Sequence, residues 1–95
     1  MAVKIMIKRR VPVDKAGELV PYLKELRVLA MNQDGYIGGE TLRRYDDPER
    51  FLVISTWQSI EDWQNWTGNE ERSAIQARID DLLGSKTEYE IYQYK

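Results

Sequence analysis

Arginines near the ends of predicted strands are the side chains in this sequence best suited to hold a negatively charged ligand. Arg9 falls near the end of a strand expected over residues 2–11, and Arg43 and Arg44 fall near the end of the next strand. An arginine that points into a pocket could bind a carboxylate, an enolate or a phenolate, and could stabilise charge developing on oxygen. Because side chains alternate along a strand, Arg9 shares the face of the apolar residues within 3–7. The alternative for Arg9 is a solvated strand end.

Two tryptophans, Trp63 and Trp66, lie about one helical turn apart in a predicted helix. Tryptophan offers a large apolar surface with a single N–H donor, so this pair could line a flat aromatic pocket. Core packing is the interpretation we favour for Trp63, and both interpretations stay open for Trp66. Trp57, at the end of a strand, is expected to be a packing anchor where the strand meets the helix.

Five of the tyrosines are candidates for the core or for an interface: Tyr36, Tyr45, Tyr89, Tyr92 and Tyr94. A tyrosine hydroxyl could also donate a proton to a bound ligand. Tyr45 is therefore kept as a candidate ligand-binding residue, together with Arg9, Arg43, Trp63 and Trp66.

The sequence contains neither cysteine nor histidine. Disulfides, thiolate nucleophiles and cysteine metal sites are therefore excluded. Without histidine the chain also lacks the commonest general base, metal ligand and haem ligand, and serine–histidine hydrolysis is ruled out. The acidic pairs at 70–71 and 80–81 are interpreted as the first turn of a helix and as a solvated face. We expect neither a metal site nor a cofactor.

The composition is typical of a small folded domain. The chain has 95 residues, of which 42% are apolar and 32% are charged, as expected for one domain over residues 1–95. Charges of both signs are mixed and sum to −2, and the one cationic run spans only residues 8–10, so no nucleic-acid partner is expected. No apolar run approaches the roughly 20 residues of a membrane helix, and the N-terminus lacks a secretory signal. We therefore expect a cytoplasmic protein without a membrane partner.

Hydrophobic periodicity predicts four strands and two helices in the order β-α-β-β-α-β. The second helix, between Ser59 and Gly84, is expected to break at Gly68-Asn69. Two split β-α-β units of this kind interleave into an antiparallel sheet with helices on one face, which is the ferredoxin-like α+β arrangement. The predicted strands are 2–11, 36–45, 51–57 and 87–94, and the first helix is 14–33.

Several residues mark where these elements begin, bend or end. Asp14, Ser59 and Asn69 are predicted to be helix N-caps, because their side-chain oxygens can accept a bond from a free N–H of the first turn. Pro21 either kinks the first helix or falls in the first turn of a helix that begins later. Gly38-Gly39 predicts a bulge in the second strand or the close approach of another backbone.

The strand at 51–57 carries apolar or neutral side chains on both faces. Helices cover only one face of a ferredoxin-like sheet, so the other face would leave an apolar patch in water. Packing two copies face to face about a two-fold axis buries that patch, and we therefore expect a homodimer. One face carries Phe51, Val53 and Ser55, and the other carries Leu52, Ile54 and Thr56.

Two stretches resemble the antibiotic biosynthesis monooxygenase family. Residues 35–42 read Gly-Tyr-Ile-Gly-Gly-Glu-Thr-Leu and are followed by Asp46-Asp47-Pro48, and residues 53–63 read Val-Ile-Ser-Thr-Trp-Gln-Ser-Ile-Glu-Asp-Trp. The resemblance covers the whole chain in length and element order. It implies a dimeric α+β barrel in which each subunit has a pocket between its sheet and its helices. Some members oxidise aromatic polyketide intermediates or quinols with dioxygen and without metal or flavin, and others bind and open haem.

The positions of the haem-degrading members match this chain only in part. Their second tryptophan lies nine residues after the strand-end tryptophan, as Trp66 follows Trp57 here. Their iron-ligating histidine lies ten residues further on, where this chain has Gln76, and their pocket asparagine falls close to Arg9. Haem degradation by that mechanism is therefore not expected, because glutamine is a poor iron ligand. In many other members the position of Trp66 is a histidine, so that acid–base group is missing too.

Three functional hypotheses follow. The first is a cofactor-independent monooxygenase that acts on a small aromatic or quinol substrate, held and stabilised by Arg9 or a tyrosine. The second is a non-catalytic dimer, either one that binds a small ligand or a stress-related protein with a vestigial pocket, which the absence of histidine and cysteine favours. The third is haem binding without degradation.

Overall fold

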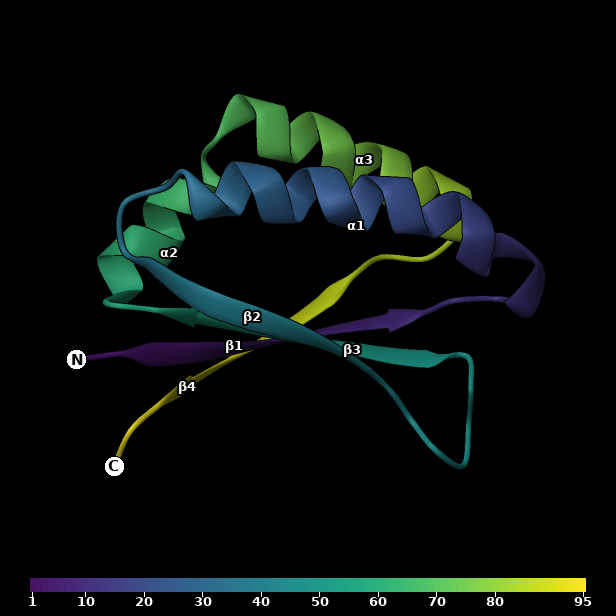
Figure 1. The fold of residues 1–95 in the computed structure, drawn as a ribbon, viewed down its shortest axis with the longest axis horizontal. Coiled ribbons are helices and arrows are strands. Elements are labelled where there is room, and N and C mark those ends of the chain that lie inside the picture. Colours follow the sequence, from purple (N-terminus) through teal and green to yellow (C-terminus); the bar gives the residue numbers. More distant parts are fainter.

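The computed structural model describes residues 1–95 and consists of two layers. Helices α1 and α3 lie over one face of an antiparallel sheet and leave the opposite face uncovered (Figure 1). The strand order in the sheet is β2-β3-β1-β4, so β1 and β3 are central and β2 and β4 are edges. The predicted β-α-β-β-α-β order, with its broken second helix, is confirmed. The elements are β1 (Val3–Arg10), η1 (Val13–Lys15), α1 (Ala16–Met31), β2 (Tyr36–Arg43), β3 (Arg50–Trp57), α2 (Ile60–Thr67), α3 (Glu70–Leu83) and β4 (Glu88–Gln93).

The core lies between the sheet and the helices and has two parts. One part is rich in tryptophan and lies around the end of β3, and the other is aliphatic and joins α1 to α3. The first part uses alternate residues of β1 and the end of β3 that point toward the helices, as period-two alternation predicts. The first contains Val3, Ile5, Ala30, Trp57, Trp63 and Trp66, and the second contains Val11, Leu19, Ile75 and Ile79.

Side-chain caps start α2 and α3 as predicted. The Ser59 hydroxyl oxygen accepts a bond from the Asp62 N–H at 3.1 Å and donates to the Asp62 carboxylate at 2.9 Å. Asn69 Oδ1 accepts from the Arg72 N–H at 2.9 Å. A cap of this kind contributes about 1 kcal/mol to stability. The Ser59 cap therefore sets where α2 begins. The Asn69 cap sets where the broken helix restarts as α3, and with it the position of Arg72.

The start of α1 differs from the prediction. Asp14 lies within the short helix η1 and caps nothing, because α1 begins at Ala16 with Lys15 before it and no side-chain cap. Pro21 lies inside α1, in its second turn, where it removes a single backbone hydrogen bond. With 16 residues α1 is the longest helix, and no helix of the protein has both the length and the apolar character needed to cross a membrane.

A β-bulge interrupts β2 at the predicted place. The pairing of β2 with β3 shifts between Tyr36 and Gly38, which leaves Ile37 as the extra residue. A Cβ atom at Gly39 would lie 3.0 Å from the Tyr36 hydroxyl and 3.3 Å from the Ile54 carbonyl oxygen. The sequence prediction offered a bulge or a close backbone approach, and the structure has both.

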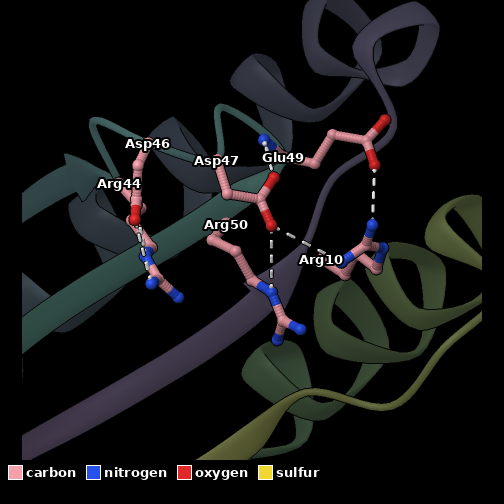
Figure 2. A network of polar contacts seen from close by, with 6 residues as sticks. All are labelled: Arg10, Arg44, Asp46, Asp47, Glu49 and Arg50. Atoms are coloured by element: carbon pink, nitrogen blue, oxygen red, sulfur yellow. Dashed lines mark hydrogen bonds and ion pairs between the residues drawn. The ribbon is translucent and has the colours of Figure 1, made fainter.

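The loop between β2 and β3 is held by exposed ion pairs, which Figure 2 shows. The Asp47 carboxylate lies 3.5 Å from Arg50 and 3.9 Å from Arg10 at the end of β1. Glu49 lies 3.1 Å from the same Arg10 guanidinium, and Arg44 pairs with Asp46. Exposed pairs of this kind add little stability. They do mean that the acidic side chains of this loop are paired with arginines of the loop itself and of the adjoining strands.

We expect Gly35→Ala to lower the free energy of unfolding by more than about 1–2 kcal/mol, the cost of the left-handed backbone alone. Gly35 has φ +84°, and a Cβ atom there would overlap the Asp62 carboxyl group. Its carbonyl also accepts a 2.7 Å bond from the Gln58 N–H, so the backbone cannot turn away freely.

Gly17→Ala is the matched control for urea unfolding. Gly17 lies in α1 with open space around it, so alanine there leaves stability unchanged or raises it by up to about 1 kcal/mol. Equal stability of the two variants would contradict the strain assigned to Gly35.

Candidate functional site

A cavity of about 70 Å³ lies between the helix-covered face of the sheet and the helices. Its walls come from all four strands and from α1, α2 and α3. Three of the residues selected from the sequence line it, namely Arg9, Trp63 and Trp66. Arg43 and Tyr45 do not line it.

The two tryptophans form one wall of this cavity and are fixed from behind by Trp57. The Trp57 and Trp66 rings stack with centroids 5.9 Å apart, and the Trp63 ring meets Trp57 edge-on at 6.0 Å. Trp57 is fully buried, and its ring N–H donates to the Ser55 hydroxyl at 2.7 Å. The predicted role of Trp57 as a packing anchor is confirmed. Trp63 and Trp66 belong to the core and line the cavity at the same time, so the two interpretations coexist.

Arg9 is buried, with 6% of its surface exposed, although it lies next to the end of β1. Its Nε donates to the Thr87 hydroxyl at 3.2 Å and its Nη2 donates to Gln76 Oε1 at 3.1 Å. Gln76 and Thr87 in turn donate to the same Asp80 oxygen at 2.9 Å and 3.0 Å. The Arg9 charge therefore reaches a carboxylate only through two neutral groups, and a solvated strand end is excluded.

Burial is the main influence on the protonation of Arg9. Desolvation lowers the pKa of its guanidinium below the usual value, and the positive charge of Arg72 acts in the same direction. The negative charge of Asp80 opposes this effect. Because a guanidinium is a very strong base, Arg9 stays cationic at neutral pH despite this lowered pKa.

Arg72 is a second buried arginine of the cavity, and the sequence analysis missed it. Only 9% of its surface is exposed, and its Nη2 donates to the Tyr89 hydroxyl at 2.9 Å. Its guanidinium carbon lies 5.7–5.9 Å from the ring centroids of Trp63, Trp66 and Tyr89, within cation–π range. One signal could have identified it: Arg72 is three residues before Ile75, on the buried stripe of α3.

Gln76 does not fit a haem-binding role. Its amide oxygen accepts from Arg9, and its amide nitrogen donates to Asp80 and to Thr87, the latter at 2.7 Å. The amide oxygen, the atom of Gln76 that could act as a ligand, is therefore already bonded to the Arg9 guanidinium. The cavity of about 70 Å³ is also far below the roughly 300–1,000 Å³ of pockets for larger ligands. The residues present do not hold haem.

The charged residues that line the cavity are all arginines: Arg9, Arg27 and Arg72. No aspartate or glutamate lines it, and its other ionisable groups are the hydroxyls of Tyr36 and Tyr89. No group of three or more acidic side chains lies close enough together to hold a metal ion. The cavity is thus suited to an anionic oxygen next to a flat apolar group.

The two remaining sequence candidates lie elsewhere. Arg43 is the last residue of β2 and lines a separate, wider hollow of about 600 Å³ at one end of the sheet. Tyr45 is fully exposed in the loop after β2. The strand was expected to continue to Tyr45, but pairing ends at Arg43 because the ion-paired turn begins there.

Comparison with solved structures identifies relatives of the fold. A conserved protein from Methanosarcina mazei Go1 has a TM-score of 0.91 at 20% identity, covering 100% of this chain and 94% of that one. Rv0793 from Mycobacterium tuberculosis has a TM-score of 0.86 at 13% identity, covering 100% and 96%. SnoaB, a cofactor-independent oxygenase from Streptomyces nogalater, has a TM-score of 0.81 at 14% identity, covering 99% and 93%. At these identities the likeness shows a shared fold.

Sequence comparison adds the family. No curated protein matches the chain. The family model described as antibiotic biosynthesis monooxygenase matches residues 2–78, which include β1 to α2 and most of α3. The chain therefore belongs to the antibiotic biosynthesis monooxygenase family.

Proposed function

We propose that this protein is a cofactor-independent monooxygenase whose substrate is a small quinol or another electron-rich aromatic ring. One observation carries the proposal: buried arginines and a tryptophan wall meet in a cavity with no carboxylate in its lining. The ring of the substrate would lie against Trp63 and Trp66, and its oxygen would face Arg9.

The proposed reaction needs an electron-rich, deprotonated substrate. A quinol that loses its hydroxyl proton can pass electrons to dioxygen; the ring then gains one oxygen atom as a new carbonyl, and the second oxygen leaves as water with two hydrogens from the substrate. Arg9 would lower the energy of the phenolate and of the oxyanion that follows. The helices above the cavity would exclude water from the reactive intermediate.

The size of the cavity limits the substrate to a single ring. A cavity of about 150 Å³ is known to hold benzene, about twice the volume seen here. A ring must therefore displace one wall. Tyr89 is the side chain best placed to move, because it lies on the edge strand β4 and is 38% exposed.

A non-catalytic ligand-binding protein is the second candidate. It is favoured by the lining itself, which offers no histidine, aspartate or glutamate as a general base. A substrate would have to lose its proton to water, to a tyrosine, or through the lowered pKa that adjacent arginines impose on it. Ligand binding without oxygen uptake would support this second function.

We expect the wild-type protein to consume oxygen with one or more monocyclic quinols, faster than each quinol oxidises alone. Arg9→Met removes the oxyanion-stabilising charge, so kcat falls about a hundredfold or more. Because Arg9→Met leaves the Gln76–Thr87–Asp80 network without its cation, circular dichroism and urea unfolding first establish that the variant is folded.

Arg78→Met is the matched control for oxygen electrode measurements. Arg78 is exposed on α3 and outside the cavity lining, so its loss leaves turnover unchanged. A broad panel of quinols with no enzymatic oxygen uptake would refute the oxygenase proposal.

The Asp80 carboxylate is proposed to position Arg9 through Gln76 and Thr87. Asp80→Asn removes the charge that balances the guanidinium, and we expect the free energy of unfolding to fall by about 1–2 kcal/mol. Asp81→Asn, at the exposed neighbouring position, is expected to change it by less than about 0.5 kcal/mol. Equal values for both variants in urea unfolding would show that Asp80 does not support Arg9.

We also propose that two copies pair through the uncovered face of the sheet. The register of β1, β2 and β3 places Met6, Leu42, Leu52 and Ile54 together on this face. Tyr92 of β4 adds an exposed aromatic ring beside them. The same register places the Lys8–Glu90 ion pair, at 2.9 Å, beside these apolar side chains. A face with such an apolar group is covered in a two-fold dimer of sheets packed face to face.

Sedimentation equilibrium tests the dimer. We expect a mass of about 22 kDa, twice the 11.2 kDa of one chain. Ile54→Asp buries a charge in the proposed interface and gives the monomer, whereas Val28→Asp on the exposed surface of α1 leaves the dimer intact. A wild-type monomer at micromolar concentration would overturn the proposal.

A further inference from the structure

We infer that the ligand of the cavity carries a carboxylate group on its aromatic ring, and that Arg72 is the residue that selects it. The inference rests on the proposed function, because it names the substrate class of the same cavity. It concerns binding, so it can be tested separately from oxygen chemistry.

The Arg72 guanidinium has a positive charge without a carboxylate partner. It takes part in none of the ion pairs of the protein, and its one side-chain hydrogen bond goes to the neutral Tyr89 hydroxyl. The three aromatic rings around it disperse the charge but accept no directed N–H bond. A buried cation in this state gains more from an added carboxylate than an exposed one would.

Free donors of Arg72 also open onto the cavity. A guanidinium has five N–H donors, and the bond to Tyr89 uses only one. No fully enclosed side-chain nitrogen or oxygen of the protein lacks a partner, so the unbonded nitrogens of Arg72 are not fully enclosed, and Arg72 lines the cavity. The planar pair of N–H groups matches the two oxygens of a carboxylate.

Arg9 has a different electrostatic position. Gln76 and Thr87 hold two of its nitrogens and connect it to the charge of Asp80. It is therefore partly compensated and fixed in place, as suits a group that stabilises charge developing during a reaction. Arg72, without such compensation, suits a charge that the ligand carries from the start.

The two arginines line the same cavity with different partners. Arg72 and Gln76 are four residues apart on α3, so their side chains leave the helix about 6 Å apart along its axis. Gln76 contacts Arg9 directly, whereas the Arg72 guanidinium lies over the rings of Trp63 and Trp66. A ring lying on Trp63 and Trp66 could present a carboxylate to Arg72 and a hydroxyl to Arg9.

The test compares gentisate, a quinol with a carboxylate, with gentisamide, its neutral amide of nearly the same shape. Binding is measured without oxygen by the change in tryptophan fluorescence, because Trp63 and Trp66 line the cavity. We expect the wild-type protein to bind gentisate at least tenfold more tightly than gentisamide. Arg72→Met should abolish this preference, and Arg72→Lys should retain part of it, because lysine keeps the charge without the planar fork.

Arg78→Met is the control here too, since it removes one positive charge from the exposed side of α3 and should keep the full preference. Circular dichroism and urea unfolding of each variant show whether it is folded. If Arg72→Met does not fold, Arg72→Lys alone decides, because its preference must be weaker than that of the wild type.

Equal binding of the acid and the amide, or an undiminished preference in either folded Arg72 variant, would overturn the inference. Selective binding of gentisate without any oxygen uptake would support it while refuting the proposed oxygenase. Oxygen uptake with neutral quinols and no preference for the acid would support the proposed oxygenase and overturn the inference about Arg72.

Discussion

The stacking of Trp57 on Trp66 is the interaction on which the candidate site depends. Trp57 ends β3 and is fully buried, so it fixes the point at which the sheet meets α2. Tyr36, at the start of β2, meets the same ring edge-on at 5.3 Å. One side chain thus sets the positions of two strands and of the helix that supplies the tryptophan wall. Without this fixed corner, the cavity would have no defined shape.

The second constraint is electrostatic and comes from α3. Arg72, Gln76 and Asp80 are each four residues apart, so they project from one side of that helix toward the sheet. Along this side a cation is followed by an amide and then by a carboxylate. The Asp80 carboxylate balances the charge of Arg9 through Gln76, whereas Arg72, one turn away from Gln76, has no carboxylate partner. The position that carries an iron-ligating histidine in haem-degrading relatives, as the resemblance implies, is here the amide in the middle of this series.

Most of the fold could be predicted from the sequence because it rests on local signals. Alternation in β1 placed Arg9 on the helix-facing side, and the cap residues Ser59 and Asn69 located the break in the second helix. Asp14 failed as a cap because a short 3-10 turn precedes α1, and the choice between that turn and a simple N-cap depends on tertiary packing.

The candidate site could be predicted only in part. Arg72 was missed because an arginine that follows two glutamates is typical of the solvated first turn of a helix. It is buried only because α3 packs against α2 and the sheet. Tyr45 was selected because the strand was extended by two residues beyond its end at Arg43. The volume of the cavity is set by side chains from seven elements. A local sequence pattern describes one element at a time, so it cannot predict this volume.

Gly39 is a position at which a single substitution would reshape this cavity from the backbone. It lines the cavity on β2, and even one added carbon there would press on the Tyr36 hydroxyl. A change at this position would alter the contour of the chamber and leave both buried guanidinium groups and the tryptophan wall untouched. Ligand shape and ligand charge are thus controlled by separate parts of the chain, so one could diverge during evolution, or be redesigned, while the other is kept.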